Sequence, residues 1–169
     1  MSLDVFGDKE GAYRPHQWEA IYYAVNNGAK VINMSLGSDF NGTYQDFANA
    51  DPYSDDGYKK AFEYAIDNGT TVVIAAGNDE LSFDQNWISI PAVYSNLYDG
   101  VISVAAVANT GDLSWYSNYG SQVTIAAPGG ETDFAGDPAG IFNTVPMNDY
   151  DSLQGTSMAS PVVTGSIAL

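Results

Sequence analysis

Apolar residues in the first half of the chain follow two alternating patterns. Between Pro15 and Asn27 they lie three and four positions apart, which predicts an amphipathic helix that ends at Gly28. The run from Lys30 to Leu36 is short and rich in apolar residues, and this is typical of a buried strand. The same unit then repeats, with a helical stripe from Tyr58 to Ile66 and an apolar run from Thr71 to Ala76.

Two further apolar runs, Val101 to Ala108 and Val123 to Ala127, predict buried strands. Strands of this kind, joined through helices of about a dozen residues, indicate a parallel sheet. We therefore expect an α/β fold in three layers, with helices on both faces of the sheet. The polar stretches Ser38–Asp56, Asp79–Asn96 and Glu131–Asp151 are predicted to be long loops of the kind that bind ligands, with disorder as the alternative.

Ligands of parallel sheets bind beyond the carboxyl ends of the strands. Two short segments occupy such places here, Ser35–Gly37 and Gly77–Asn78. We expect functional residues in both.

The composition excludes several classes of binding partner and metal site. The formal net charge of −16, from 21 acidic and 5 basic residues, would repel nucleic acid and excludes it as a partner. The sequence has no cysteine, which excludes disulfides and thiolate metal sites. No apolar run approaches the roughly 20 residues that span a bilayer, so we expect no membrane association.

One serine near the end of the chain stands among small residues, in the segment Gly155–Pro161 (GTSMASP), ahead of an apolar helical run. At a helix N-terminus the free N–H groups and the helix dipole stabilise negative charge, as an acyl-transfer nucleophile requires. Taken by itself, the pattern favours an ordinary helix cap at Ser157, with the nucleophile as the alternative.

The GTSMASP segment matches the nucleophile motif of the subtilisin-like serine proteases residue for residue. VINMSLG (31–37), VVIAAGN (72–78), SWYSNYG (114–120) and VTIAAPG (123–129) resemble further motifs of that family, in the family's order. The chain thus resembles the later part of a subtilisin-like catalytic domain from about Val5 to its last residue.

This resemblance implies that Ser157 is the nucleophile and that Asn78, with the backbone N–H of Ser157, stabilises the oxyanion. It also implies that a peptide substrate adds as a strand beside a cleft segment. The implied substrate-binding residues are Ser35, Leu36, Gly37, Ala75, Ala76, Gly77 and Thr156, with Glu10–Ala12 on the opposite side. Asp79, directly after Asn78, is expected to favour basic or polar substrate side chains.

No metal or other cofactor is implied for catalysis. A structural calcium ion is common in the family, and the resemblance places it in the loop Pro91–Val101, at carbonyls near Ala92 and Tyr94. The scattered acidic residues do not by themselves indicate a calcium site.

The chain lacks two sequence segments that are expected in the family. The family order is Asp, His, Ser, but the first two segments do not occur, and the single histidine, His16, is expected on the surface. We therefore interpret residues 1–169 as a partial catalytic domain that lacks the upstream segments and the C-terminal end. Val162 and Thr164 stand where the family has histidine and a smaller residue. A cut sheet would also expose apolar surface, so self-association of the fragment is expected.

The leading hypothesis is a secreted serine endopeptidase that acts on peptides or proteins through an acyl-enzyme on Ser157, with this chain inactive by itself. A pseudoprotease that binds peptides without cutting them is the alternative. An α/β-hydrolase is disfavoured because Ala159 stands where its motif needs glycine, and a dinucleotide-binding module because no strand is followed by its glycine motif.

Overall fold

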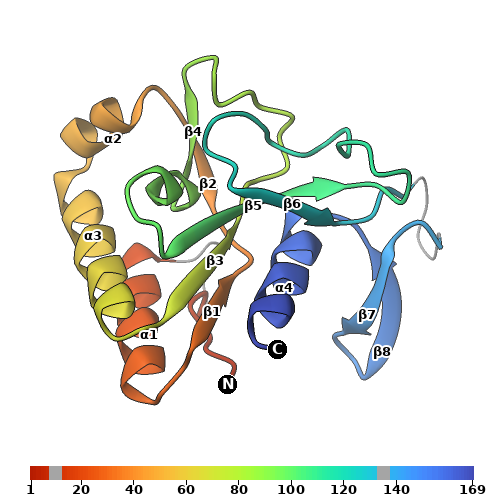
Figure 1. Cartoon of the computed structure of the whole chain (residues 1–169), viewed down its shortest axis with the longest axis horizontal. Helices are drawn as coiled ribbons and strands as arrows, with labels where there is room; N and C mark the ends of the chain where they lie inside the picture. The colour runs from red at the N-terminus through yellow and green to blue at the C-terminus, as the bar shows by residue number, and fades with distance from the viewer. Residues whose placement is uncertain (8–12, 133–137) are drawn as a thin grey trace.

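The computed structural model describes residues 1–7, 13–132 and 138–169 (Figure 1). In chain order its elements are α1 (Arg14–Asn26), β1 (Val31–Met34), β2 (Ser38–Asn41), α2 (Tyr44–Ala50), α3 (Pro52–Asp67), β3 (Thr71–Ala75), β4 (Trp87–Ile90), the 3₁₀ helix η1 (Ala92–Asn96), β5 (Val101–Val107), β6 (Ile125–Pro128), β7 (Ile141–Val145), β8 (Asp149–Leu153) and α4 (Thr156–Ile167).

The central sheet has the strand order β1-β3-β5-β6, and all of its pairings are parallel. Helices α1 and α3 lie on one side of it and α4 on the other (Figure 1). The predicted three-layer α/β fold is confirmed. The predicted helix at Pro15–Asn27 and the strand within Lys30–Leu36 correspond to α1 and β1.

Strand β3 explains why the apolar runs are nearly continuous. Val72 and Ile74 pack into the core cluster shared with α1 and α3, whereas Val73 packs into the cluster that contains Ala159 and Val163 of α4. Because successive side chains of a strand point to opposite faces, a sheet covered on both faces needs apolar residues at every position. The same packing fixes α4, and therefore its first turn, against the sheet.

The three long loops of the prediction contain regular structure, and this part of the prediction was wrong. Within Ser38–Asp56 lie β2, α2 and the beginning of α3, while Asp79–Asn96 contains β4 and η1. Strands β2 and β4 form a two-stranded antiparallel sheet, with Ser38 opposite Ile90. The third stretch contains β7 and the start of β8, which pair as an antiparallel hairpin.

Helix α2 shows why polar composition misled the prediction. Its first turn is closed by a capping box between Thr43 and Asp46, and it buries a single large residue, Phe47. Reciprocal capping and one anchor stabilise a short helix that has no long apolar stripe.

In the described part of the chain, no helix is both long and apolar enough to span a membrane. The segment Glu10–Ala12, expected opposite the cleft strand, lies outside the described residues.

Candidate active site

Ser157 is the second residue of α4, and the chain enters this helix through Gly155. Gly155 has φ 147°, a backbone conformation that favours glycine. Its N–H donates to the carbonyl oxygen of Gly129 and to the hydroxyl of Tyr116, both at 3.0 Å. The predicted helix N-terminus at the serine is therefore present, and it is anchored to the end of β6.

Pro161 lies inside α4 and leaves one carbonyl of the first turns without a helical partner. Proline has no N–H, so the carbonyl oxygen of Ser157, four residues earlier, lacks the usual helical hydrogen bond from residue 161. The hydroxyl of Ser35 donates to that oxygen at 2.8 Å. The segment after β1 is thereby tied directly to the serine.

Ser157 is half-buried, and its hydroxyl donates to the carbonyl oxygen of Ser35 at 3.4 Å. This is a long hydrogen bond to a weak base, and it leaves the hydroxyl available for another acceptor.

Asn78 follows β3 and is held by Thr156. The backbone N–H and the hydroxyl of Thr156 donate to Oδ1 of Asn78 at 2.8 and 2.9 Å. Because a backbone N–H can only donate, the oxygen of the Asn78 amide must face it, and Nδ2 must point elsewhere. The hydroxyl of Thr156 also accepts the N–H of Gly77 at 3.1 Å.

Two donors converge on the space beside Gly155. A Cβ atom added to Gly155 would lie 3.6 Å from Nδ2 of Asn78 and 3.6 Å from the backbone nitrogen of Ser157. The absence of a side chain at Gly155 keeps this space open. Two N–H donors that meet next to a serine hydroxyl at a helix N-terminus form an arrangement suited to stabilising an oxyanion.

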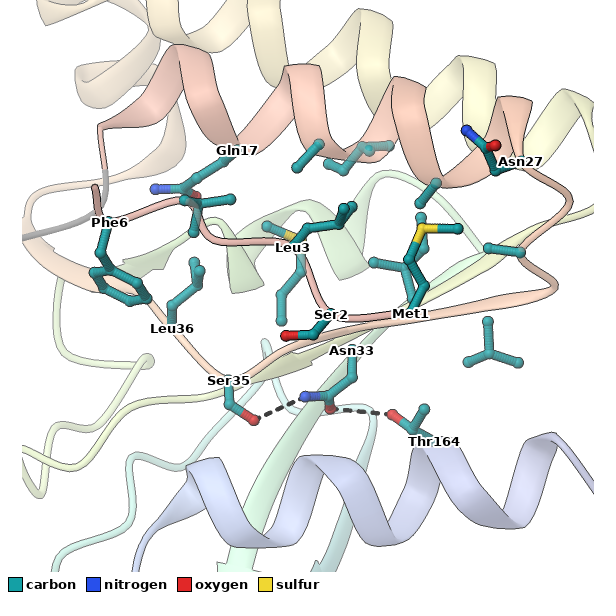
Figure 2. A pocket seen from close by; sticks show the side chains of 18 of the residues that line it. Met1, Ser2, Leu3, Phe6, Gln17, Asn27, Asn33, Ser35, Leu36 and Thr164 are labelled. Atoms are coloured by element: carbon teal, nitrogen blue, oxygen red, sulfur yellow. Dashed lines mark hydrogen bonds between the residues drawn. The ribbon is translucent and has the colours of Figure 1, made fainter. Parts of the chain in front are cut away.

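Asn33, on β1, joins the segment after β1 to helix α4. Its Nδ2 donates to the Ser35 hydroxyl at 2.9 Å, and its Oδ1 accepts the hydroxyls of Ser160 at 2.7 Å and Thr164 at 3.1 Å. Figure 2 shows Asn33 between Ser35 and Thr164, at the rim of a pocket of about 680 Å³. Thr164, the residue expected to be smaller from the family resemblance, therefore has a polar partner on β1.

The expected substrate-binding residues divide into two groups. Ser35, Leu36 and Gly77 are half-buried and Gly37 is exposed, so the segment Ser35–Gly37 is open to a ligand. Ala75, Ala76 and Thr156 are buried, with exposures of 4%, 0% and 0%. Their side chains do not reach the surface, and Thr156 contacts Asn78 and Gly77, which makes it a support of the site in this structure.

Asn118 belongs to one of the motifs in the sequence, but the sequence suggested no role for it. It is fully buried, and its Oδ1 accepts the N–H groups of Asp79 at 3.0 Å and Leu81 at 2.9 Å. Its Nδ2 donates to the carbonyl oxygen of Ala76 at 3.1 Å and to Oδ1 of Asp39 at 3.0 Å. One side chain thus contacts the backbone on both sides of Asn78.

Asp39 and Asp79 are in contact next to this site. Burial of the Asp39 carboxyl, together with the hydrogen bond and charge of Asp79, raises the pKa of Asp39 to about 7, against the opposing hydrogen bonds from Asn118 and Ser89. The position that a Cβ of Gly77 would take is 3.4 Å from Oδ1 of Asp39. A carboxyl group that the sequence did not single out therefore lies beside the residue that precedes Asn78.

His16 is exposed at the start of α1, as predicted, and its ring packs edge-on against Tyr13 with 5.1 Å between centroids. Among the described residues, the hydroxyl of Ser157 bonds to Ser35 and not to this histidine.

In the loop expected to hold calcium, one of the carbonyl groups proposed as a ligand already accepts hydrogen bonds. The carbonyl oxygen of Tyr94 accepts the N–H groups of Leu97 at 3.0 Å and Tyr98 at 3.1 Å. Across the described ranges, no group of three or more His, Cys, Asp or Glu side chains is placed to hold a metal ion. A cation in this loop would depend on the remaining carbonyls and water.

The family comparison and the sequence relatives agree on the class of protein that this chain resembles. The model of the subtilase family matches residues 1–169. Subtilisin DY from Bacillus licheniformis is 38% identical over 149 residues, covering 88% of this chain and 45% of the relative. The halolysin-like extracellular serine protease Nep from Natrialba magadii is 36% identical over 169 residues, 100% of this chain and 26% of the relative. The major intracellular serine protease from Bacillus subtilis (strain 168) is 33% identical over 172 residues, 100% of this chain and 46% of the relative.

Among solved structures, the nisin leader peptidase NisP from Lactococcus lactis is similar with a TM-score of 0.81 and 29% identity. That match covers 98% of this chain and 54% of the other. The chain therefore spans about half or less of the length of the proteins that it matches.

Proposed function

Because the chain belongs to the subtilase family, we propose that its protein is a serine endopeptidase that hydrolyses peptide bonds through an acyl-enzyme on Ser157. The observation that carries this proposal is the convergence of Asn78 Nδ2 and the Ser157 N–H on the space beside Gly155, each 3.6 Å from the same point. There they would stabilise the negative charge that develops on the carbonyl oxygen when the Ser157 hydroxyl attacks.

The base and the orienting acid would come from outside this chain. In the described residues the Ser157 hydroxyl donates only to a backbone carbonyl, which cannot take up its proton. In the family the aspartate and histidine precede the serine. Among the described residues β1 is the edge strand of the sheet on that side. It borders the pocket of Figure 2, where an additional part of the domain would pack. The chain alone is expected to be inactive, and the open edge is where copies would associate.

The substrate is expected to be an extended peptide. Among the described residues, no strand pairs with Ser35–Gly37, the segment that follows β1. Gly37 has no side chain that would cover its backbone. Main-chain pairing with this segment would place the scissile carbonyl near Ser157.

A fluorophosphonate probe tests the proposal on the protein expressed with its upstream region. Labelling of the wild type that disappears in Ser157→Ala, together with cleavage of an unstructured protein such as casein, supports it. A folded wild-type protein that binds peptides but takes no label would favour the peptide-binding pseudoprotease, in which Ser157 serves as a helix residue.

We further propose that the protein acts outside the cell. The formal net charge of −16 fits a secreted protein, and one relative is named as extracellular, although another is named as intracellular. Probe labelling of separated culture medium and cells distinguishes the two locations.

A further inference from the structure

Asn118 is an extensively bonded polar side chain near the site, although it touches no atom of the proposed reaction. It lies in the loop between β5 and β6, forty residues after Asn78, and is fully buried. A buried side-chain amide is costly unless its donors and acceptor are all used, and here both donors and both lone pairs of the oxygen have partners.

The partners of Asn118 bracket the oxyanion asparagine. Ala76, whose carbonyl it binds, precedes Asn78 by two residues, and Asp79 and Leu81, whose N–H groups it binds, follow it. Its own backbone N–H donates to the carbonyl oxygen of Gly77 at 3.0 Å. Asn118 therefore fixes the main chain on both sides of Asn78, while Thr156 fixes the Asn78 side chain.

Gly77 is adapted to this contact. A Cβ atom at Gly77 would lie 2.3 Å from Nδ2 of Asn118, and its φ of 107° favours glycine. The loop that carries Asn78 can pass over the Asn118 amide only because Gly77 has no side chain.

We propose that Asn118 is a positioning residue for the oxyanion site, acting on catalysis through Asn78. This inference rests on the proposed function. A displacement of an oxyanion donor by about 1 Å lowers turnover by up to roughly 10²-fold, so the backbone clasp around Asn78 contributes to rate as well as to folding.

A double-mutant cycle on the full-length protein separates these contributions. Active sites are counted by fluorophosphonate titration, and kcat is expressed per titrated site. Asn118→Ala is expected to lower kcat by about tenfold to a hundredfold with KM changed less than about threefold. In an Asn78→Ala background, where the donor is already absent, the same substitution should lower kcat by less than about threefold.

Gln122→Ala is the matched control. Gln122 is also a buried amide, and its Nε2 donates to the carbonyl oxygen of Trp87 on β4 at 3.0 Å, away from Asn78. It should reduce the number of active sites or the melting temperature, yet leave kcat per site within about threefold. Should Asn118→Ala fail to fold, Asn118→Ser carries the same cycle, since it also removes the amide that contacts Ala76, Asp79 and Leu81 but leaves a hydroxyl in the buried site.

Equal losses of kcat in the two backgrounds would overturn the inference, because Asn118 would then act independently of Asn78. Loss of active sites with unchanged kcat per site would also overturn it and leave Asn118 a folding residue. If the wild-type protein takes no label, the proposed function fails first, and that result is seen before any variant is compared.

Discussion

The hydroxyl of Thr156 offers a direct test of how the site is held. It donates to Oδ1 of Asn78 at 2.9 Å and accepts the N–H of Gly77 at 3.1 Å, and the residue is fully buried. Thr156→Val removes this hydroxyl at nearly constant volume. The backbone N–H of residue 156, 2.8 Å from Asn78 Oδ1, remains in place.

The expected magnitudes follow from these contacts. Two hydrogen bonds are lost, at about 1 kcal/mol each, and the Gly77 N–H is left without its partner, so the unfolding free energy should fall by about 2–3 kcal/mol. Asn78 keeps one of its two anchors. In a subtilisin, complete removal of the oxyanion asparagine lowers turnover roughly 10²–10³-fold, which sets the upper limit for a variant that only loosens this side chain. For the loss of one anchor we expect a fall in kcat of about tenfold.

The assay is hydrolysis of a chromogenic peptide by the full-length protein, with kcat expressed per titrated serine, and denaturant unfolding for stability. Thr70→Val is the control, since Thr70 is also buried and donates its hydroxyl to the carbonyl oxygen of Ala29 at 2.7 Å, before the start of β3. It should lower the unfolding free energy by about 1 kcal/mol and leave kcat unchanged. A Thr156→Val enzyme with wild-type kcat, or with a raised KM instead, would refute the view that Thr156 acts by orienting Asn78.

Three further predictions concern charge and calcium. The raised pKa of Asp39, about 7 against an ordinary 3.8, means that the folded state binds this proton more tightly, so the unfolding free energy should decline as pH rises from about 4 to 7. Asp39→Asn should flatten that decline, by about 1–2 kcal/mol after allowance for partial solvent exposure, and an unchanged pH profile of urea unfolding would contradict it. Asp79→Asn should lower kcat/KM for substrates with lysine or arginine before the cut bond about tenfold relative to leucine, and an unchanged ratio would rule out Asp79 as a selector. Removal of calcium with EGTA should lower the melting temperature if the Pro91–Val101 loop binds the ion, and equal melting curves with and without calcium would exclude structural calcium.

The sequence predicted those helices and strands that carry a regular pattern of apolar residues. Helix α1 was found within about a residue at each end, and β3 and β5 were found as buried strands because both faces of the sheet are covered there. The run Val123–Ala127 does overlap β6, but the prediction that this strand is buried was wrong, because β6 lies at the edge of the sheet and only Ala127 in it is buried. The hairpin of β7 and β8 was missed for a physical reason: Phe142 and Tyr150 stack on each other while 70% and 60% exposed, so its aromatic residues follow no buried stripe. Strand β4 was missed although its sequence, WISI, is apolar, because it was judged as part of a polar stretch.

Only those residues of the candidate site that belong to local sequence motifs were predicted. Ser157 and Asn78 stand in local motifs, and the structure brings them together at the carboxyl ends of the strands. Asp39 and Asn118 gain their significance only from residues that are distant in sequence, since the bond that joins them spans 79 positions. No local pattern marks such a pair, apart from the glycine at position 77 that leaves room for the Asn118 amide.

The segment Gly155–Pro161 shows that a short motif can encode long-range contacts. Gly155 keeps open the space on which the two donors converge, and Thr156 orients Asn78. Ser160 binds Asn33 of β1, and Pro161 frees the Ser157 carbonyl for the hydroxyl of Ser35. These contacts link the first turns of α4 to β1, to the segment after β3 and to the end of β6. The same short segment therefore carries contacts that hold the fold together and contacts that shape the proposed site.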